Sequence, residues 1–220
     1  MSVRKFVIVD GSSLLSTCYY AVLPREILFA KTDEEKMRHY DKILHAADGT
    51  YTNGIFGVLK AVASLVKRQQ PDHVAFVFDK TRDTFRRELY PDYKGTRTST
   101  PEPLKQQFVL LEQILADAGF KVLYSDRYEA DDYAGSLVMK FRDQIPMVVM
   151  TKDHDYQMCI RDSRKVTHTK MRFFRLHLLQ NGRETADLLG PFPDQLRILP
   201  PDIAPPDLQQ PPHLFRAQAA

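Results

Sequence analysis

The sequence predicts an α/β fold built on a mostly parallel central sheet. Three short apolar runs rich in valine, isoleucine, methionine and phenylalanine have the length and composition of buried parallel strands: Phe6–Val9, Val74–Phe78 and Met147–Met150. Segments with helical spacing of apolar residues lie between them. This alternation of strands and helices favours parallel pairing with right-handed crossovers.

The other elements follow in chain order. Gly11-Ser12-Ser13 can turn the chain after the first strand and cap a helix. Residues 24–44 are charged and lack a clean period, which predicts a partly helical surface insertion. Asn53 is expected to cap a helix that Pro71-Asp72 ends. Further elements are a helix from Gly11-Ser12-Ser13 to residue 21, helices over 102–118 and 129–142, a strand over 121–124, and a last strand opened by Pro146.

The pattern changes after Gln157, where no strand and helix alternation resumes. Eight of the 14 prolines fall after residue 190, a density that prevents regular structure. We therefore expect a domain over 1–157 and an unmatched, disordered, proline-rich tail over 158–220, with at most an isolated helix over 171–179.

Composition narrows the class of protein. The chain has 220 residues and a net charge of +3, enough for one α/β domain and only weakly favouring a polyanionic partner. Cys18 and Cys159 cannot make a disulfide framework, and neither has a neighbour at metal-ligand spacing. There is no signal peptide and no membrane-spanning stretch. These features predict a cytoplasmic protein with no membrane association.

Acidic residues follow the predicted strands. In open α/β sheets, sites form beyond the carboxyl ends of the strands, so these carboxylates should converge on one edge. The set is Asp10, Asp79, Asp153 and Asp155, with Glu129, Asp131 and Asp132 at the start of a predicted helix. Carboxylates gathered in one cleft repel each other unless cations neutralise them, which predicts a Mg²⁺ or Mn²⁺ site acting on phosphate. The structural alternatives are helix capping by the Glu129 group and turn formation by Asp10.

A basic stretch with interleaved aromatic residues follows the second strand. It contains Arg82, Arg86, Tyr93, Lys94 and Arg97. Arginine can bind phosphate bidentately, lysine supplies a point charge and tyrosine offers a stacking face, so these residues are candidates for DNA binding. A solvated basic helix is the alternative.

Six ordered motifs together resemble the bacterial 5′→3′ exonuclease domain, which is found at the N-terminus of DNA polymerase I and in stand-alone proteins and is related to flap endonucleases. The motifs are Val9-Asp10-Gly11, Phe78-Asp79, Phe85-Arg86, Tyr93-Lys94-Gly95-Thr96-Arg97, Tyr128-Glu129-Ala130-Asp131-Asp132 and Thr151-Lys152-Asp153-His154-Asp155. The resemblance covers roughly residues 3–157. It implies a Rossmann-like, PIN-type three-layer domain.

The resemblance also implies a function. It implies hydrolysis of DNA phosphodiester bonds at 5′ ends, flaps or nicks, with two divalent ions held by the seven carboxylates. Lys94 and Arg97 match basic residues that lie on a helical arch and act on the scissile phosphate. No obligatory protein partner is implied.

The chain departs from the family in three places. Thr17 stands where the family usually has an arginine, residues 24–44 are longer, and nothing after Gln157 matches the Gly-Asp-x-x-Asp-Asn pair or the helix–two-turn–helix that grips duplex DNA. Two alternatives therefore stay open beside an active nuclease. One is a truncated, catalytically impaired relative that binds nucleic acid, and the other is a PIN-type ribonuclease.

Overall fold

A parallel sheet forms the centre of the molecule. The computed structural model describes residues 5–81, 83–95 and 99–152, and the backbone alone of 166–170. Within these residues the sheet has five strands in the order β3-β2-β1-β4-β5, and each neighbouring pair is parallel. The strands are β1 (Phe6–Asp10), β2 (His73–Asp79), β3 (Lys121–Ser125), β4 (Met147–Thr151) and β5 (Val166–Lys170). The predicted α/β fold with a parallel sheet is confirmed.

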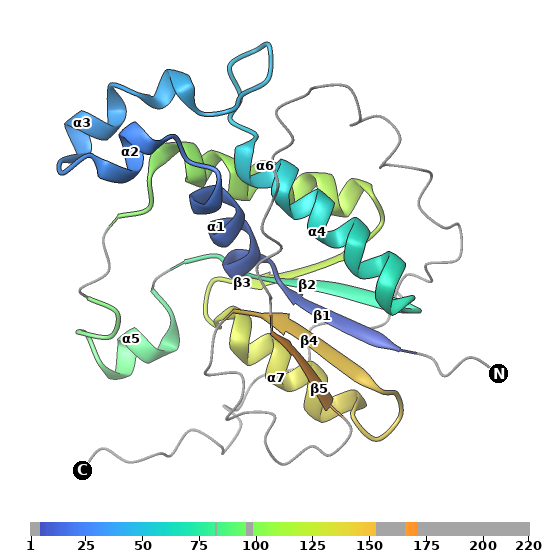
Figure 1. Cartoon of the computed structure of the whole chain (residues 1–220). Coiled ribbons are helices and arrows are strands. Elements are labelled where there is room, and N and C mark those ends of the chain that lie inside the picture. The colour runs from blue at the N-terminus through green and yellow to red at the C-terminus, as the bar shows by residue number, and fades with distance from the viewer. Residues whose placement is uncertain (1–4, 82, 96–98, 153–165, 171–220) are drawn as a thin grey trace.

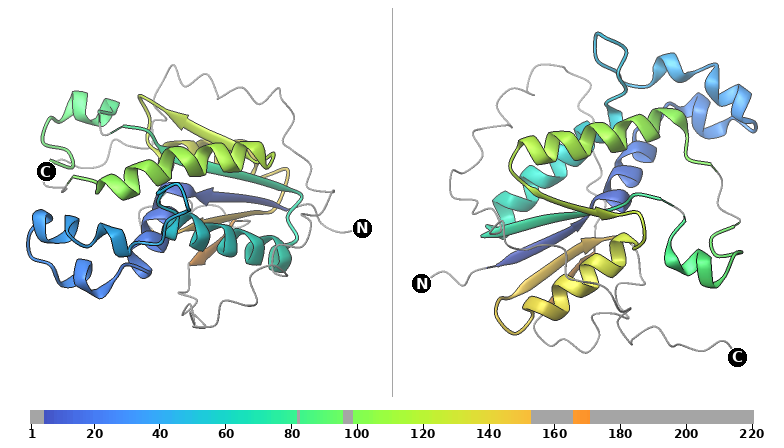
Figure 2. Two further views of the ribbon diagram at one scale, coloured as in Figure 1. Left: turned by 90° about the horizontal axis from the view of Figure 1, so that it is seen from above. Right: turned by 180° about the vertical axis from the view of Figure 1, so that it is seen from behind.

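Helices cover both faces of this sheet (Figures 1 and 2). On one face, side chains of β1 and β2 pack with α1 (Gly11–Ala21), α4 (Asn53–Gln69) and α6 (Glu102–Asp117). On the other face, Phe6, Ile8 and their neighbours pack with α7 (Ala130–Phe141). Every residue of β1 and β4 is buried, as expected for strands covered on both sides. The result is the three-layer arrangement that the sequence predicts.

Two glycines let α1 approach its neighbours closely. A Cβ on Gly11 would lie 2.3 Å from the ring of Phe78, so the turn after β1 can sit on that ring only without a side chain. A Cβ on Gly57 would lie 2.8 Å from Cβ of Cys18, where α4 crosses α1. These contacts fix the start of α1 at the carboxyl end of β1.

The insertion after α1 is partly helical, as predicted. It contains α2 (Arg25–Phe29), α3 (Asp33–Met37) and the 3-10 helix η1 (Tyr40–Lys42). Ile27 and Ile43 are buried and attach it to the main core. In Figure 1 these short helices lie above α1, away from the sheet. Among the helices that the structure describes, none is long and apolar enough to cross a membrane.

The fifth strand corrects the predicted end of the fold. Val166–Lys170 pairs in parallel with β4, although the sequence analysis made β4 the last strand and placed 158–220 in a tail. The error has a physical reason. Continuous apolar runs predict buried strands, whereas four of the five residues of Val-Thr-His-Thr-Lys are polar. An edge strand pairs on one side only and tolerates such a sequence. The predicted helix over 171–179 and the proline-rich segment lie outside the described residues.

Helix boundaries differ from the predictions by one or two residues. α4 begins at Asn53 with Thr52 as N-cap, so Asn53 does not cap it. The Asn53 side chain is buried and donates instead to the carbonyl of Tyr19, 3.2 Å away. Asn53 therefore joins α4 to α1 rather than capping the N-terminus of its own helix.

Candidate active site at the carboxyl edge of the sheet

Asp10 ends β1 and is buried at the start of α1. Its Oδ1 accepts a hydrogen bond from the backbone N–H of Ser13 at 2.9 Å and so caps the helix. Its Oδ2 accepts from the hydroxyl of Thr151 at the end of β4, also at 2.9 Å. Asp10 thus has a structural role as the N-cap of α1, where turn formation is the alternative that the sequence suggests. The same bonds hold the carboxylate between the ends of two adjacent parallel strands.

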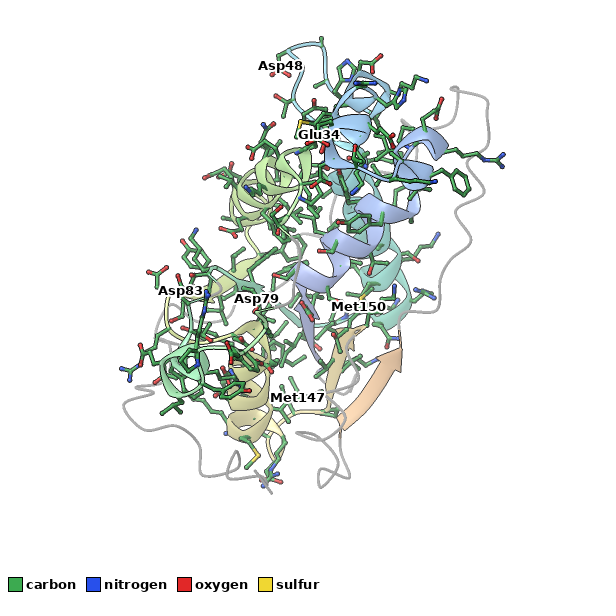
Figure 3. All side chains as sticks on the ribbon, turned by 90° about the vertical axis from the view of Figure 1, so that its left-hand side faces the viewer. Glu34, Asp48, Asp79, Asp83, Met147 and Met150 are labelled. Atoms are coloured by element: carbon green, nitrogen blue, oxygen red, sulfur yellow. The ribbon has the colours of Figure 1, made fainter. Side chains whose placement is uncertain are left out.

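Asp79 ends β2 and connects that strand to two helices. Its Oδ1 accepts from the backbone N–H of Ala130, in the first turn of α7, at 2.9 Å. Its own backbone N–H donates to the hydroxyl of Ser12 at the same distance. Figure 3 shows Asp79 in the middle of the molecule, next to the segment that carries Asp83 and α5 (Phe85–Leu89) and away from Glu34 on α3. Asp79 thus brings the acidic start of α7 to the edge where the strands end.

Glu129 and Asp132 form a capping box at the start of α7. The Glu129 carboxylate accepts from the third helical N–H, and Asp132 Oδ2 accepts from the backbone N–H of Glu129 at 3.0 Å. Both residues are buried. Helix capping, the other structural alternative for this motif, is therefore also present. It accounts for one contact of each carboxylate.

Asp131 is different, because no capping bond accounts for it. Its Oδ1 is buried and has no hydrogen-bond partner, the only such side-chain oxygen or nitrogen in the described part of the chain. Burial first, and then the neighbouring charge of Asp132, raise the pKa of Asp131 to about 6 against the opposing effect of Arg86. The fold therefore holds a carboxylate that is destabilised in its ionised form.

Two cations from the basic segment contact this cluster. The Arg86 guanidinium makes a bidentate pair with Asp132, each N···O distance being 2.7 Å, and its Nη1 lies 3.4 Å from Oε2 of Glu129. Nζ of Lys94 lies 2.9 Å from the same Glu129 oxygen. Lys94 also has a left-handed backbone with φ of 56°, which is uncommon for a residue with a side chain.

The basic segment is held close to α7 by further contacts. The hydroxyl of Tyr93 donates to Glu129 Oε2 at 3.3 Å, and the backbone N–H of Phe85 donates to the carbonyl of Arg127 at 3.0 Å. The ring of Phe85 packs on Tyr128, with 5.6 Å between ring centroids. The structure thus brings Arg86, Tyr93 and Lys94 to the acidic cluster, as the predicted joint site requires. Their DNA contacts stay a prediction.

Several predicted site residues lie outside the described residues: Arg82, Arg97, Asp153 and Asp155. Among the residues that are described, no three acidic, histidine or cysteine side chains stand close enough together to form a complete metal cage. Some of the cluster carboxylates face Arg86 and Lys94 instead. Of the predicted metal ligands, five therefore lie within the described residues and two, Asp153 and Asp155, lie outside them.

Three hydroxyl groups hold these acidic residues in place, and the sequence patterns did not predict this role. Thr84 is buried just before α5 and donates to Glu129 Oε1 at 3.3 Å, while Ser12 and Thr151 contact Asp79 and Asp10 as described. Thr151 lies within one of the quoted motifs, and Ser12 directly follows another. Thr84 lies in an unremarkable position, and no pattern in a single sequence marks it.

The chain is similar to a described protein family. The family described as "5′-3′ exonuclease, N-terminal resolvase-like domain" matches residues 5–182. The match continues beyond residue 157, and so does the sheet. Relatives include DNA polymerase I of Streptococcus pneumoniae, 30% identical over 70% of this chain, and a 5′-3′ exonuclease of Aquifex aeolicus, 33% identical over 63%. The chain covers only 16% of the first relative and 41% of the second.

Solved structures show the same fold. The T5 D15 protein co-crystallised with metal ions matches with a TM-score of 0.52 and 21% identity, over 76% of this chain and 55% of that one. T5 5′-exonuclease with bound divalent metal ions (zinc) matches with a TM-score of 0.50 and 19% identity, over the same shares of the two chains. At these identities the likeness concerns the fold alone. The family match over most of the sequence carries the assignment, and the chain belongs to the 5′-3′ exonuclease N-terminal resolvase-like domain family.

Proposed function

We propose that this chain carries the catalytic edge of a structure-specific 5′ nuclease that hydrolyses DNA phosphodiester bonds with Mg²⁺ or Mn²⁺. The observation that supports this most strongly is Asp131. One buried oxygen of Asp131 has no hydrogen-bond partner, while its other oxygen lies 3.9 Å from Nη2 of Arg86. Keeping that oxygen unsatisfied costs free energy, which a divalent cation would relieve. Family membership supplies the reaction class.

The residues present fit a hard cation. Mg²⁺ and Mn²⁺ take oxygen ligands, mainly carboxylates and water. Because the described residues alone contain no group of three such side chains close enough to hold an ion, we propose that Asp79, Glu129, Asp131 and Asp132 contribute ligands together with residues outside the described part of the chain. Asp10, Asp153 and Asp155 would complete the site. When bound, the ions would activate a water molecule and stabilise the leaving oxygen. The hydroxyls of Ser12, Thr84 and Thr151 would keep the ligand residues in place.

The ammonium of Lys94 pairs with Glu129 rather than standing free to contact a phosphate. Its ammonium lies on Glu129, where a metal ion would compete with it. Once displaced, it can move onto the scissile phosphate and offset the charge that develops there. Lys94→Ala should then lower the single-turnover rate on a 5′-flap by about 100-fold or more while weakening DNA binding much less. A loss confined to binding, and erased by moderate salt, would make Lys94 part of a screened surface only.

Metal dependence is the direct test of the function. The chain should cleave a 5′-flap or nicked duplex in Mg²⁺ or Mn²⁺, and EDTA should abolish cleavage. Asp131→Asn should lower cleavage on the order of 100-fold and weaken Mn²⁺ binding measured by calorimetry. Asp143→Asn is the matched control, since Asp143 lies just beyond the other end of α7 and its side chain is 81% exposed. Equal behaviour of the two variants, or undiminished cleavage in EDTA, would overturn the proposal.

The departures from the family favour one second candidate. Nothing after Gln157 in this sequence matches the second carboxylate pair or the duplex-gripping element, and a chain without them would bind DNA with little turnover. Metal-responsive DNA binding without cleavage would identify that case.

Cleavage of single-stranded RNA in preference to flap DNA would identify a PIN-type ribonuclease instead. The proposal includes a cytoplasmic location, where an enzyme of DNA replication and repair in bacteria meets its substrate.

A further inference from the structure

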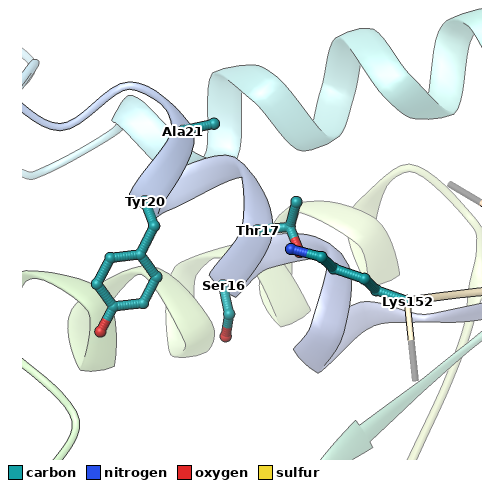
Figure 4. Close-up of a pocket in the computed structure, with 5 residues that line it drawn as sticks. All are labelled: Ser16, Thr17, Tyr20, Ala21 and Lys152. Carbon is teal, nitrogen blue, oxygen red and sulfur yellow. The ribbon is translucent and has the colours of Figure 1, made fainter. Parts of the chain in front are cut away.

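An open pocket of about 360 Å³ lies on the outer face of α1. It is lined by Ser16, Thr17, Tyr20, Ala21 and Lys152. Figure 4 shows the tyrosine ring at one end, the lysine side chain at the other and the two smaller hydroxyl residues between them, with the ammonium beside Thr17. None of these residues belongs to the proposed metal site.

The lining has the chemistry of a phosphate site. Three of the five side chains carry a hydroxyl, one carries an ammonium, and none is acidic. Hydroxyls and ammonium groups are donors that suit phosphate oxygens, and such contacts make up much of protein–DNA recognition. The ring of Tyr20 is about half exposed, and it makes an edge contact with the buried ring of Tyr19 that holds it in place. An ordered, exposed tyrosine can flank a sugar or base.

The pocket is also fixed relative to the acidic edge. Lys152 directly follows Thr151, whose hydroxyl donates to Asp10, and its backbone N–H lies 3.4 Å from the hydroxyl of Ser13. Asp10 caps the N-terminus of α1, and the pocket residues of α1 lie one to three turns further along the same helix. A strand with one phosphate at the carboxylates therefore runs within reach of this pocket.

The cation and the hydroxyls of the pocket come from different elements. Ser16, Thr17 and Tyr20 on α1 contribute only hydroxyl groups. The positive charge in the pocket comes instead from the end of β4, through Lys152. Two elements thus combine to line one pocket with donors.

We propose that this pocket binds a second phosphate of the DNA strand that the acidic edge cleaves, with Lys152 as the charged contact and Thr17 as a hydroxyl contact. The proposal rests on the proposed function for its choice of DNA. It adds a subsite outside the metal ligands. It predicts that removing the lysine charge weakens strand binding without removing the chemistry of hydrolysis.

Binding measured without metal separates the two proposals. Fluorescence anisotropy of a 5′-flap DNA in EDTA should show Lys152→Ala binding about 5–10-fold more weakly than the unchanged chain. The slope of log K against log salt should fall in magnitude by about one phosphate contact. Lys67→Ala is the matched control, because Lys67 is exposed in the last turn of α4, which contacts Lys5 before β1 at the opposite edge of the sheet. It should bind DNA within about twofold of the unchanged chain.

A relocated charge provides the sharper test. Thr17→Arg introduced together with Lys152→Ala should restore most of the affinity, because it returns a cation to the same pocket from α1. DNA with and without a 5′-phosphate separates the two sources of the phosphate. A loss with both DNAs indicates a phosphodiester within the strand, and a loss only with the phosphorylated DNA indicates the terminal phosphate.

Two outcomes overturn the inference. One is a Lys152→Ala effect no larger than that of Lys67→Ala, and the other is a double variant no better than the single one. Either result leaves the proposed function standing if the unchanged chain still cleaves flap DNA. If the unchanged chain never cleaves DNA but Lys152→Ala still weakens binding, the phosphate pocket stands and the proposed nuclease function is wrong.

Discussion

Two polar clusters of this fold differ in how completely their buried groups are paired. In the first, the side chain of Gln107 on α6 is fully buried and uses both ends of its amide. Its Oε1 accepts from the backbone N–H groups of Gly54 and Ile55, at 2.8 and 3.2 Å. Its Nε2 donates to Oδ1 of Asn53 and to the carbonyl of Pro103, at 2.8 and 2.9 Å. This cluster carries no charge and satisfies the N–H groups at the start of α4.

The second cluster, at the start of α7, is charged and incompletely paired. Arg86 and Lys94 neutralise part of the charge on Glu129 and Asp132, while Asp131 keeps one oxygen without a partner. A satisfied polar network makes a core more specific, whereas a partly satisfied one destabilises it. Strain that selection retains in this way is typical of sites where a ligand completes the set. The Gln107 cluster therefore joins helices with every amide group paired, whereas the α7 cluster keeps an unpaired oxygen, and this is the feature on which the proposed cation site rests.

The largest effect should come from breaking the bidentate pair in the charged cluster. Arg86→Met removes the partner of Asp132 and leaves a buried carboxylate without its counter-charge. We expect the free energy of unfolding to fall by about 3–5 kcal/mol, measured by urea denaturation in EDTA. Arg87→Met is the matched control, since Arg87 is exposed and pairs with exposed Asp83, and its loss should be below about 1 kcal/mol.

Added metal should distinguish a structural ion pair from a metal-competent one. If a divalent cation can take the place of the Arg86 charge, excess Mn²⁺ should raise the melting temperature of Arg86→Met more than that of the unchanged chain. Equal shifts in both proteins would mean that the carboxylates gain nothing from a cation in this place. The comparison between the clusters would then reduce to two structural networks.

A smaller loss should follow from opening the neutral cluster. Gln107→Leu removes the acceptor of two backbone N–H groups and the donor to Oδ1 of Asn53, and we expect about 2–4 kcal/mol of destabilisation by thermal or urea unfolding. Gln113→Leu, on the exposed side of the same helix, should change stability by less than about 0.5 kcal/mol. Mn²⁺ should not shift the melting temperature of Gln107→Leu more than that of the unchanged chain. A larger metal response there would contradict the division of roles.

The sequence was sufficient for the parts of this comparison that depend on periodicity. Apolar runs located β1, β2 and β4, and the acidic residues after them led to the edge where Asp10 and Asp79 now lie. The order of strand and helix then required that these ends meet. The acidic start of α7 was found for the same reason.

The remaining features depend on contacts that no local pattern encodes. β5 has only one apolar residue among its five, so it does not stand out as an apolar run. Gln107 lies on an amphipathic helix, and only the packing of α6 against α4 shows that it is buried. The pairing of Arg86 with Asp132 joins residues far apart in the chain, and it was not expected for a residue predicted to contact DNA. Long-range partners of this kind are set by the tertiary fold.

The smallest effect is also the one with the opposite sign. Because burial and neighbouring charge raise the pKa of Asp131 to about 6 from its usual value of 3.8, the ionised carboxylate destabilises the folded state. The penalty is absent below pH 3.8, grows between the two values and is complete above pH 6. In EDTA at pH 8, Asp131→Asn should therefore stabilise the chain by about 1–3 kcal/mol, while Asp143→Asn should leave it nearly unchanged. The advantage of Asp131→Asn should shrink as the pH is lowered towards 4, and saturating Mn²⁺ should reverse it by stabilising only the chain that retains the carboxylate. Destabilisation by Asp131→Asn in EDTA would show that this carboxylate is as well satisfied as Gln107, and the contrast between the two clusters would be lost.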